Sequence, residues 1–345
     1  MTSIAPFITS FLREHLPQQR NLSNNTCDSY AYAFQLLFSF TSEKIKVPPC
    51  EITLEQIDAP LVFSFLQHLE VDRNNSPSSR NVRLAAIKSF MRYVQYRVPS
   101  ALDQVQAILA IPIKKTDSRL INYLTVAEMQ AILDAPDPSQ RDGIRDRAMF
   151  HLAFATGLRV SELVGLRMDD VSLQPTPTIL IHGKGRKERQ LPLWADTAKA
   201  LRAWLSIRGE AAVPELFLNA RGNHLSRSGF EYILTKHVTA AAKNRPSLNN
   251  KKVSPHVLRH TCAMNTLQAT KDLRKVSLWL GHASLQTTEI YLRADPTEKL
   301  EVLEATVHPN LRRGHFRPPD KLIASLRPPK LCAATERSET ARHGP

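Results

Sequence analysis

The segment AIPIKKTDSRLI, from Ala110 to Ile121, divides the chain into two parts. It contains a proline and two lysines and shows no helical spacing of apolar residues, which is typical of an extended connection. We therefore predict a helical N-terminal domain over residues 1–110, a linker over residues 111–122 and a second domain over residues 123–305. A chain of 345 residues is long enough for two domains that each bury a hydrophobic core.

The first 110 residues have the apolar spacing of helices. Between Tyr30 and Phe38, apolar residues recur at positions i, i+4, i+7 and i+8. Four helices with short connections predict a small bundle. The predicted helices are Ser3–Leu16, a second that starts at Asn24 or Thr26, a third that opens with the capping box Thr53-x-x-Gln56, and a fourth that starts at Ser76-Pro77.

The predicted fourth helix also carries a row of basic residues: Arg80, Arg83, Lys88 and Arg92. On a bundle that does not bind DNA, such residues form a solvated face. In a strongly basic chain they are equally candidates for contacts with DNA phosphates. We take Arg80, Arg83 and Lys88 as candidate DNA-contact residues.

The second domain is predicted to be mainly helical with a small β-hairpin or sheet. Thr125-x-x-Glu128 is a capping box that opens a helix, and a later, mostly apolar helix ends at Gly157. The stretch TILIHGKGRKERQLPL, residues 178–193, places two β-rich runs around a glycine-flanked turn, which predicts a hairpin. Helical spacing then returns from Thr197 to about Leu303.

The composition limits the kinds of partner. A formal net charge of +14 and an isoelectric point near 9.8 indicate a polyanionic partner, either nucleic acid or an anionic membrane surface. The membrane option weakens because no apolar run approaches the ~18 residues of a spanning helix and no signal peptide is visible. The four cysteines have no CxxC spacing, so we expect a reduced, cytoplasmic protein without a disulfide framework or a zinc site. Residues 306–345 are basic and rich in proline, and we predict a mostly disordered tail there.

Arg159, in the motif GLRVSEL, is the first candidate for binding a phosphate. It is predicted to start a helix, where free backbone N–H groups favour an anion, and its guanidinium can grip two phosphate oxygens. Glu162 lies on the same helix face and could hold Arg159 or a histidine in place. The alternative is an exposed arginine with an ordinary ion pair.

The predicted hairpin turn supplies further cations. Lys184 lies between Gly183 and Gly185, where a lysine can swing toward a ligand, although turn lysines are usually only solvated. The basic residues beside it are interpreted as DNA-backbone contacts or plain surface charge: Arg186, Lys187 and Arg189.

The stretch from Ser254 to Arg293 carries the remaining candidates. His256 and Arg259 share one face of a predicted helix. His260 is interpreted as a satisfied core or interface histidine. His282 follows a glycine, where it could also serve only as a cap, and Tyr291 comes nine residues later. Tyrosine is a known covalent nucleophile that needs help from its surroundings, and a lone tyrosine here would more often be a core residue.

Taken in order, GLRVSEL, GKGRKERQLPL, HVLRH, LGH and the tyrosine resemble the motifs of the tyrosine recombinase (phage integrase) family. The motifs cover residues 120–300, and the N-terminal helices have the size and position of the family's SAM-like core-binding domain. The resemblance implies an α+β catalytic domain that cuts and rejoins double-stranded DNA through a 3′-phosphotyrosyl intermediate. It further implies that neither metal nor ATP nor another cofactor is needed. The implied assembly is a homotetramer on two DNA sites, with related recombinases as possible further partners.

The resemblance assigns the candidate residues to one reaction at a single phosphorus atom. Tyr291 would attack the phosphodiester, and Lys184 would protonate the leaving 5′-oxygen. The other implied members are Arg159 and Arg259, which would hold the non-bridging oxygens, His256, which would assist proton transfer at the nucleophile, His282, which would hydrogen-bond the scissile phosphate, and Glu162, the supporting acidic residue.

Three functions are compatible with this pattern. The first is an active site-specific recombinase, the integrase or transposase of a mobile element. The second is a DNA-binding accessory subunit that does not cut, against which the complete catalytic set argues. The third is an enzyme similar to type IB topoisomerases, and the N-terminal helices and the LGH spacing favour recombination over it.

Overall fold

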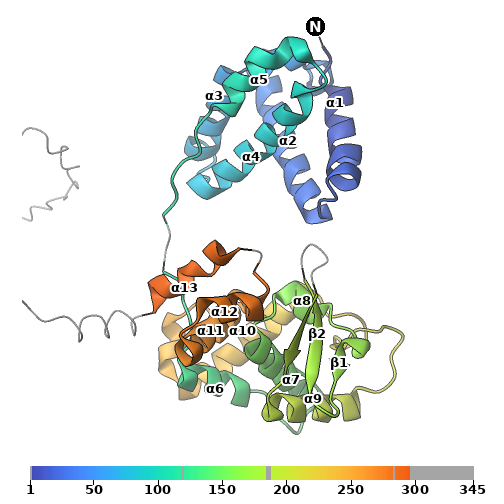
Figure 1. Cartoon of the computed structure of the whole chain (residues 1–345), viewed down its shortest axis with the longest axis vertical. Coiled ribbons are helices and arrows are strands. Elements are labelled where there is room, and N and C mark those ends of the chain that lie inside the picture. Colours follow the sequence, from blue (N-terminus) through green and yellow to red (C-terminus); the bar gives the residue numbers. More distant parts are fainter. Residues whose placement is uncertain (1, 118–119, 184–187, 283, 296–345) are drawn as a thin grey trace, which may run out of the picture. The chain divides into compact units, whose positions relative to one another are not determined.

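The computed structural model describes residues 2–117, 120–183, 188–282 and 284–295 (Figure 1). The chain divides into an N-terminal unit, Met1–Arg119, and a C-terminal unit, Leu120–Pro345. The division falls inside the segment predicted as a linker, residues 111–122. The predicted tail, residues 306–345, lies outside the described residues.

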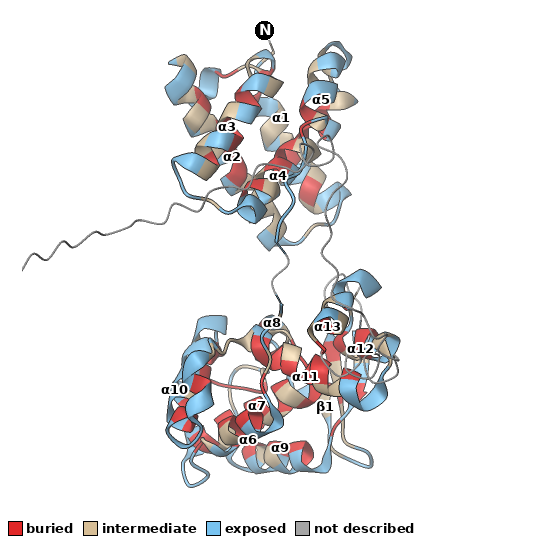
Figure 2. Cartoon of the chain, turned by 90° about the vertical axis from the view of Figure 1, so that its left-hand side faces the viewer, coloured by how far each residue is buried: buried red, intermediate tan, exposed pale blue. Residues whose placement is uncertain are grey.

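The N-terminal unit is built from helices packed around an aromatic core. Phe11, Phe34 and Phe90 meet edge to face, with ring centroids 5.4–6.1 Å apart. Figure 2 shows buried segments alternating with exposed ones along these helices, as expected where one face of each packs inward. The helices are α1 (Ala5–Ser10), which continues as a π-helix over Phe11–Gln19, α2 (Asn24–Ile45), α3 (Ala59–Val71), α4 (Pro77–Gln95) and α5 (Leu102–Leu109), with 3₁₀ turns at Pro49–Glu51, Leu54–Gln56 and Pro99–Ala101.

Two helix boundaries in this unit differ from the sequence prediction. The first helix does not end before Pro17 but passes through it, because the wider turns of the π-helix accommodate a residue without an N–H. The predicted capping box at Thr53 forms only in part: Gln56 Oε1 accepts from the Thr53 N–H at 2.9 Å, but the Thr53 hydroxyl makes no cap, and the turn is only 3₁₀. The third helix starts later, where the Asp58 side chain accepts a 2.8 Å hydrogen bond from the Leu61 N–H. A short helix that was not predicted, α5, follows the fourth.

The C-terminal unit combines helices with a small antiparallel sheet. The predicted capping box at Thr125 and Glu128 opens α6, and Gly157 ends α7, both as predicted. The helices are α6 (Val126–Asp134), α7 (Arg141–Thr156), α8 (Val160–Val164), α9 (Ala195–Arg208), α10 (Arg227–Asn244), α11 (Pro255–Thr270), α12 (Leu273–Leu280) and α13 (Glu289–Ala294), with 3₁₀ turns at Met168–Asp170, Pro246–Asn250 and Leu285–Thr287.

The sheet contains the predicted hairpin. β2 (Thr178–His182) pairs antiparallel with β3 (Glu188–Pro192), and the short strand β1 (Val171–Ser172) adds to the other side of β2 (Figure 1). Ile179 and Ile181 are buried, as the period of two requires for a sheet with one face on the core. The register pairs His182 with Glu188, so the turn of the hairpin lies between these residues.

Gly157 allows the end of α7 to approach α12 closely. Its φ of +60° lies in the left-handed region that favours glycine. A Cβ at this position would lie 2.5 Å from Leu280 Cδ2 and 3.1 Å from Cys262 Sγ. Cys262 is buried in this contact, and burial raises the pKa of its thiol to about 12, as expected for a packed residue rather than a reactive one. The glycine thereby brings the start of α8 and the end of α12 together.

Candidate active site

Residues of five elements meet in the C-terminal unit. Arg159 precedes α8, Arg189 lies on β3, Arg259 lies on α11, His282 follows α12, and Tyr291 lies on α13. The first and last of them, Arg159 and Tyr291, are 132 positions apart in the sequence, and hydrogen bonds and ring contacts join the set.

Arg259 is the buried centre of the site. Its Nη1 donates to the carbonyl oxygen of Gly157, and its Nη2 donates to that of Leu280 at 2.8 Å. Burial lowers the pKa of its guanidinium to about 10, and the charge of Arg159 contributes in the same direction. Arg259 therefore remains charged at neutral pH and ties the end of α7 to the end of α12.

Arg159 is held by Glu162, as the spacing of three residues predicted. Glu162 Oε1 accepts from Arg159 Nη1 at 2.7 Å, and Oε2 accepts from the Arg159 backbone N–H at 3.0 Å. About a third of the Arg159 side chain, 34%, remains exposed. Glu162 thus holds the backbone N–H and one Nη atom of Arg159, and part of the guanidinium side chain remains accessible to a ligand.

Arg189 completes this ion-pair cluster. Its Nη2 lies 2.9 Å from Glu162 Oε2, and its side chain is only 11% exposed. Burial alone would raise the pKa of Glu162, but the hydrogen bond and charge of Arg189, together with Arg159, bring it below its usual value. A Cβ on Gly281 would lie 3.0 Å from Arg189 Nη1, so this arginine also packs against the turn that carries His282. The prediction that Arg189 contacts DNA is untested, and the structure gives the guanidinium a partner within the protein.

Tyr291 is enclosed by two histidines. It is 1% exposed, and its hydroxyl lies 3.1 Å from His260 Nδ1. The ring of His282 stacks on it at an interplanar angle of 7°, with centroids 6.3 Å apart. Burial raises the pKa of Tyr291 to about 12, although the charge of Arg259 acts against this rise. The hydroxyl is therefore protonated at neutral pH.

His282 and His256 occupy different environments. His282 Nδ1 lies 2.8 Å from Thr288 Oγ1, and burial beside Arg259 lowers the pKa of its ring to about 4. His256 is exposed on the first turn of α11, and its ring centroid is 6.5 Å from that of His260. His282 is thus fixed beside the tyrosine, whereas His256 faces outward.

The structure changes the interpretation of His260 and does not describe the hairpin turn. His260 was expected to be a satisfied core or interface residue, but it contacts the tyrosine hydroxyl. Its spacing of four residues from His256 places both on one helix face, which was the available signal. Three predicted site residues lie outside the described residues: Lys184, Arg186 and Lys187.

The candidate DNA-contact residues of α4 have partners inside the N-terminal unit. Arg80 is buried and donates to the carbonyl oxygen of Pro112 at 3.0 Å. Lys88 Nζ donates to the carbonyl oxygens of Leu109 and Ile111 at 2.7 and 2.6 Å, and burial lowers its pKa. Arg83 donates to the Ser29 carbonyl oxygen at 3.3 Å and lies over the Tyr32 ring at 4.7 Å. Each of the three side chains thus has a partner within the unit, and the prediction that they contact DNA is untested.

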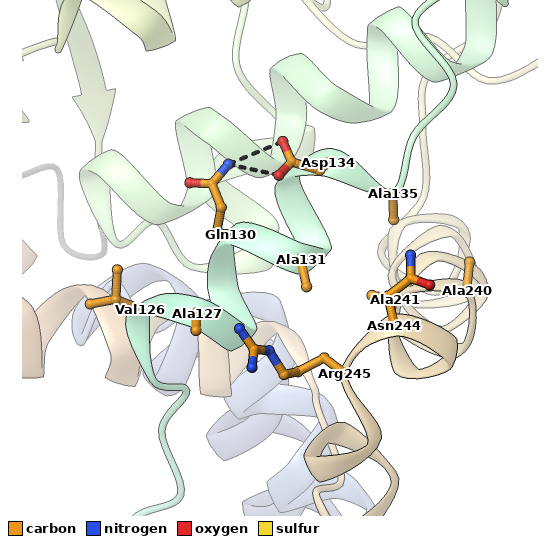
Figure 3. Close-up of a pocket in the computed structure, with 10 residues that line it drawn as sticks. All are labelled: Val126, Ala127, Gln130, Ala131, Asp134, Ala135, Ala240, Ala241, Asn244 and Arg245. Carbon is orange, nitrogen blue, oxygen red and sulfur yellow. Dashed lines mark hydrogen bonds between the residues drawn. The ribbon is translucent and has the colours of Figure 1, made fainter.

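A separate cavity of about 970 Å³ lies between α6 and α10 (Figure 3). Alanines from both helices line it, with Gln130 and Asp134 hydrogen-bonded to each other at its edge. None of its lining residues belongs to the cluster around Arg259 and Tyr291. Asn244 and Arg245 are further polar residues of its lining, and the catalytic candidates remain those of the cluster because the predicted motif residues meet there and not at this cavity.

Comparison with known proteins confirms the resemblance to the tyrosine recombinase (phage integrase) family. Residues 122–298 match the phage integrase family, and residues 8–97 match the phage integrase N-terminal SAM-like domain. The chain is 43% identical over 326 residues to the "Putative integrase/recombinase y4rC" of Sinorhizobium fredii, which covers 94% of this chain and 98% of the relative. It is 34% identical over 301 residues to the tyrosine recombinase XerC of Pelobacter propionicus, covering 87% of this chain and 94% of the relative.

Solved structures extend the comparison to the fold. A complex of the XerH site-specific recombinase has a TM-score of 0.63 at 26% identity and covers 83% of this chain and 81% of its own. The Tn1549 transposon integrase has a TM-score of 0.66, covers 89% of this chain and 100% of its own, and at 15% identity supports the fold alone.

These matches define the class of protein. The chain belongs to the phage integrase family of tyrosine recombinases. It is a site-specific DNA recombinase with a SAM-like N-terminal domain and a catalytic domain of the tyrosine recombinase fold. In the part of the chain that the structure describes, no helix is both long and apolar enough to span a membrane.

Proposed function

We propose that this recombinase cleaves DNA through Tyr291. The observation that carries the proposal is the burial of the tyrosine hydroxyl beside His260 and His282, with Arg259 close enough to influence its pKa. The phenolic oxygen forms a bond to the scissile phosphorus while the bond from phosphorus to the 5′-oxygen breaks. The products are a 3′-phosphotyrosyl link and a 5′-hydroxyl, and attack by a 5′-hydroxyl reverses the step.

The other residues stabilise the charge and move the protons of this step. Arg159 and Arg259 bind the non-bridging oxygens, which a pair of guanidinium forks suits. Lys184 gives a proton to the departing 5′-oxygen, and His282 hydrogen-bonds the phosphate. His256 is assigned to proton transfer at the nucleophile by the resemblance. Glu162 keeps Arg159 in position through the contacts given above.

The substrate is proposed to be double-stranded DNA bound by both domains. XerH was solved bound to a palindromic difH substrate, and a lambda integrase tetramer was solved on a Holliday junction. We extend this to a homotetramer on two DNA sites in the cytoplasm. The helical domain over residues 1–110 is assigned to DNA binding, and the domain over residues 123–305 to catalysis. No role is assigned to the predicted tail, residues 306–345. The biological role is that of a mobile-element integrase or transposase, in line with the integrase names of two relatives.

Covalent capture of DNA tests the nucleophile. The full chain is mixed with a library of nicked duplexes of random sequence, and DNA that stays bound after denaturation is recovered and sequenced. The unsubstituted protein is expected to enrich one site, and Tyr291→Phe is expected to recover none while retaining affinity for that site, because only the hydroxyl is lost. An adduct with Tyr291→Phe would assign the nucleophile elsewhere. Absence of any adduct from the unsubstituted protein would favour a non-cutting accessory subunit, and rejoining without partner exchange would favour a relaxing enzyme.

A sulfur-substituted substrate tests Lys184. Lys184→Ala should cleave ordinary DNA very slowly. It should recover when the scissile 5′-oxygen is replaced by sulfur, because a thiolate leaves without protonation. Arg159→Ala is the matched control and should not recover, since its task is to hold the phosphate oxygens. If Lys184→Ala fails to recover, the acid lies elsewhere, and Lys187 is the next candidate on the same turn.

A further inference from the structure

The hydroxyl of Tyr291 has a partner outside the residues that the resemblance assigns. His260 Nδ1 lies 3.1 Å from the hydroxyl oxygen, and the two rings meet edge to face with centroids 5.7 Å apart. This distance is that of a hydrogen bond. In the tautomer protonated at Nε2, His260 Nδ1 accepts the hydrogen bond that the tyrosine O–H donates. The contact joins α11 to α13 at the reacting atom itself.

Both partners of this hydrogen bond are neutral before the reaction. Burial, with the charges of His256 and Arg259, lowers the pKa of His260 to about 4. Burial raises the pKa of Tyr291 to about 12. At neutral pH the tyrosine therefore keeps its proton and the imidazole has an unprotonated nitrogen to receive it. A bound phosphodiester adds a negative charge that favours the protonated imidazole.

The neighbouring histidines are less well placed for this proton. His282 directs Nδ1 to Thr288 Oγ1 and presents its ring face to the tyrosine. His256 is exposed, one helical turn before His260. Among the residues that the structure describes, His260 is the histidine within hydrogen-bond distance of the tyrosine hydroxyl.

We infer that His260 is a further catalytic residue, which accepts the proton of Tyr291 while the phenolic oxygen attacks phosphorus. The inference rests on the proposed function. The O–H bond of the tyrosine breaks as an N–H bond forms on His260. The bond between the phenolic oxygen and phosphorus forms as the bond to the 5′-oxygen breaks, and Lys184 gives that oxygen its proton. In rejoining, the protonated His260 returns its proton to the phenol. His260 thereby takes the proton transfer that the resemblance assigns to His256, which is exposed and lies one helical turn earlier.

The test combines an isosteric substitution with a more acidic nucleophile. His260→Asn keeps an oxygen or nitrogen near the Nδ1 position but cannot be protonated at neutral pH. Single-turnover adduct formation on the captured site should fall about 10²-fold, the lower end for general acid–base catalysis. Replacing Tyr291 by difluorotyrosine in the same variant should restore at least about tenfold, because a more acidic phenol depends less on a base. Rejoining should slow by the same factor as cleavage, since both directions pass through one transition state.

His256→Asn is the matched control from the same helix face. We expect difluorotyrosine to leave its adduct rate unchanged. Rescue of His256→Asn but not of His260→Asn would overturn the inference, and so would a His260→Asn rate within about threefold of the unsubstituted protein. If His260→Asn is slow and difluorotyrosine does not restore its adduct rate, His260 only positions the tyrosine, and the inference is likewise overturned. If His260→Asn does not fold, as judged by tryptophan fluorescence, His260→Gln takes its place. An adduct with Tyr291→Phe, or none with the unsubstituted protein, would instead remove the proposed function.

Discussion

Helix α4 of the N-terminal unit and the cluster around Arg259 in the C-terminal unit share one kind of contact, in which a cationic side chain donates to backbone carbonyl oxygens. The two regions differ in how many N–H groups these contacts use. Lys88 donates to the carbonyl oxygens of Leu109 and Ile111, and Arg259 donates to those of Gly157 and Leu280. An ammonium group has three N–H donors, whereas a guanidinium has five arranged as a planar fork. Lys88 donates to two carbonyl oxygens with its three N–H groups, whereas Arg259 has three N–H groups beyond the two that donate to these carbonyls. Counting the donors already used thus separates structural cations from candidate substrate contacts better than counting charges does.

The largest expected effect comes from shortening the buried arginine. Arg259→Ala should slow adduct formation about 10²- to 10³-fold, by analogy with the loss of one oxyanion donor. Arg259→Lys should recover only part of this, because a point charge cannot form both carbonyl contacts and still reach the phosphate. Arg80→Lys is the matched control: it also shortens a buried arginine that donates to a carbonyl, and it should lower the free energy of unfolding without changing the adduct rate. An equal loss of rate in folded Arg80→Lys would remove the distinction between the two regions.

A smaller effect is expected at the turn beside Arg189. Gly281→Ala places a Cβ 3.0 Å from Arg189 Nη1 at a residue with φ of +64°. We expect a destabilisation of more than about 1 kcal/mol and a tenfold or larger loss of adduct rate, because Arg189 positions Glu162 and thereby Arg159. Gly222→Ala is the control, since Gly222 also has positive φ, +77°, but open space around its Cβ position. It should reproduce the loss of stability from the backbone but not the loss of rate.

Lys88 and Arg92, one turn apart on α4, offer a comparison within one helix. Lys88→Met should lower the free energy of unfolding by about 1 kcal/mol through its lost hydrogen bonds. It should leave the salt dependence of DNA affinity unchanged. Arg92 is exposed on the same helix, and Arg92→Met should reduce the slope of log affinity against log salt by about 1 with little change in stability. The reverse pattern would return Lys88 to the DNA contacts.

The smallest predicted effect is a difference in acid sensitivity between the units. His260 and His282 have pKa values of about 4 when folded and near 6.5 when unfolded. The unfolded chain binds more protons between these values, so stability of the C-terminal unit should fall as the pH is lowered from about 6.5 toward 4. Trp194, Trp204 and Trp279, the three tryptophans of the chain, all lie in this unit. The urea midpoint measured by tryptophan fluorescence should therefore fall between pH 6.5 and 5, with a smaller change in the part of the circular dichroism signal that comes from the N-terminal unit.

The features that the sequence predicted well are those that depend on near neighbours. The contact of Arg159 with Glu162 needs only a spacing of three residues, and the hairpin needs only two β-rich runs around a turn. The order of the motifs along the chain then identified the candidate catalytic residues. Several weak motifs in a fixed order are specific for a family, whereas a single one is not. The family and the fold followed from that order.

The features that were missed depend on distant partners. His260 meets Tyr291 across 31 positions, and Arg189 meets Glu162 across 27. Lys88 finds its acceptors only after α5 has packed against α4, and α5 itself was not predicted. A row of basic residues looks the same in sequence whether it faces DNA or a neighbouring helix end. The structure adds the partners of these side chains, which the sequence alone did not identify.

The burial of Tyr291 has a consequence for when the proposed nucleophile can react. A tyrosine that is 1% exposed cannot reach a phosphorus atom outside the protein until the groups that cover it move. For Tyr291 to act as the proposed nucleophile, the groups that cover it must be displaced while its hydrogen bond to His260 is kept. The free energy for that displacement has to come from binding, and a sequence that binds weakly supplies too little of it. A DNA site that binds tightly would thus expose the tyrosine, and a site that binds weakly would leave it covered.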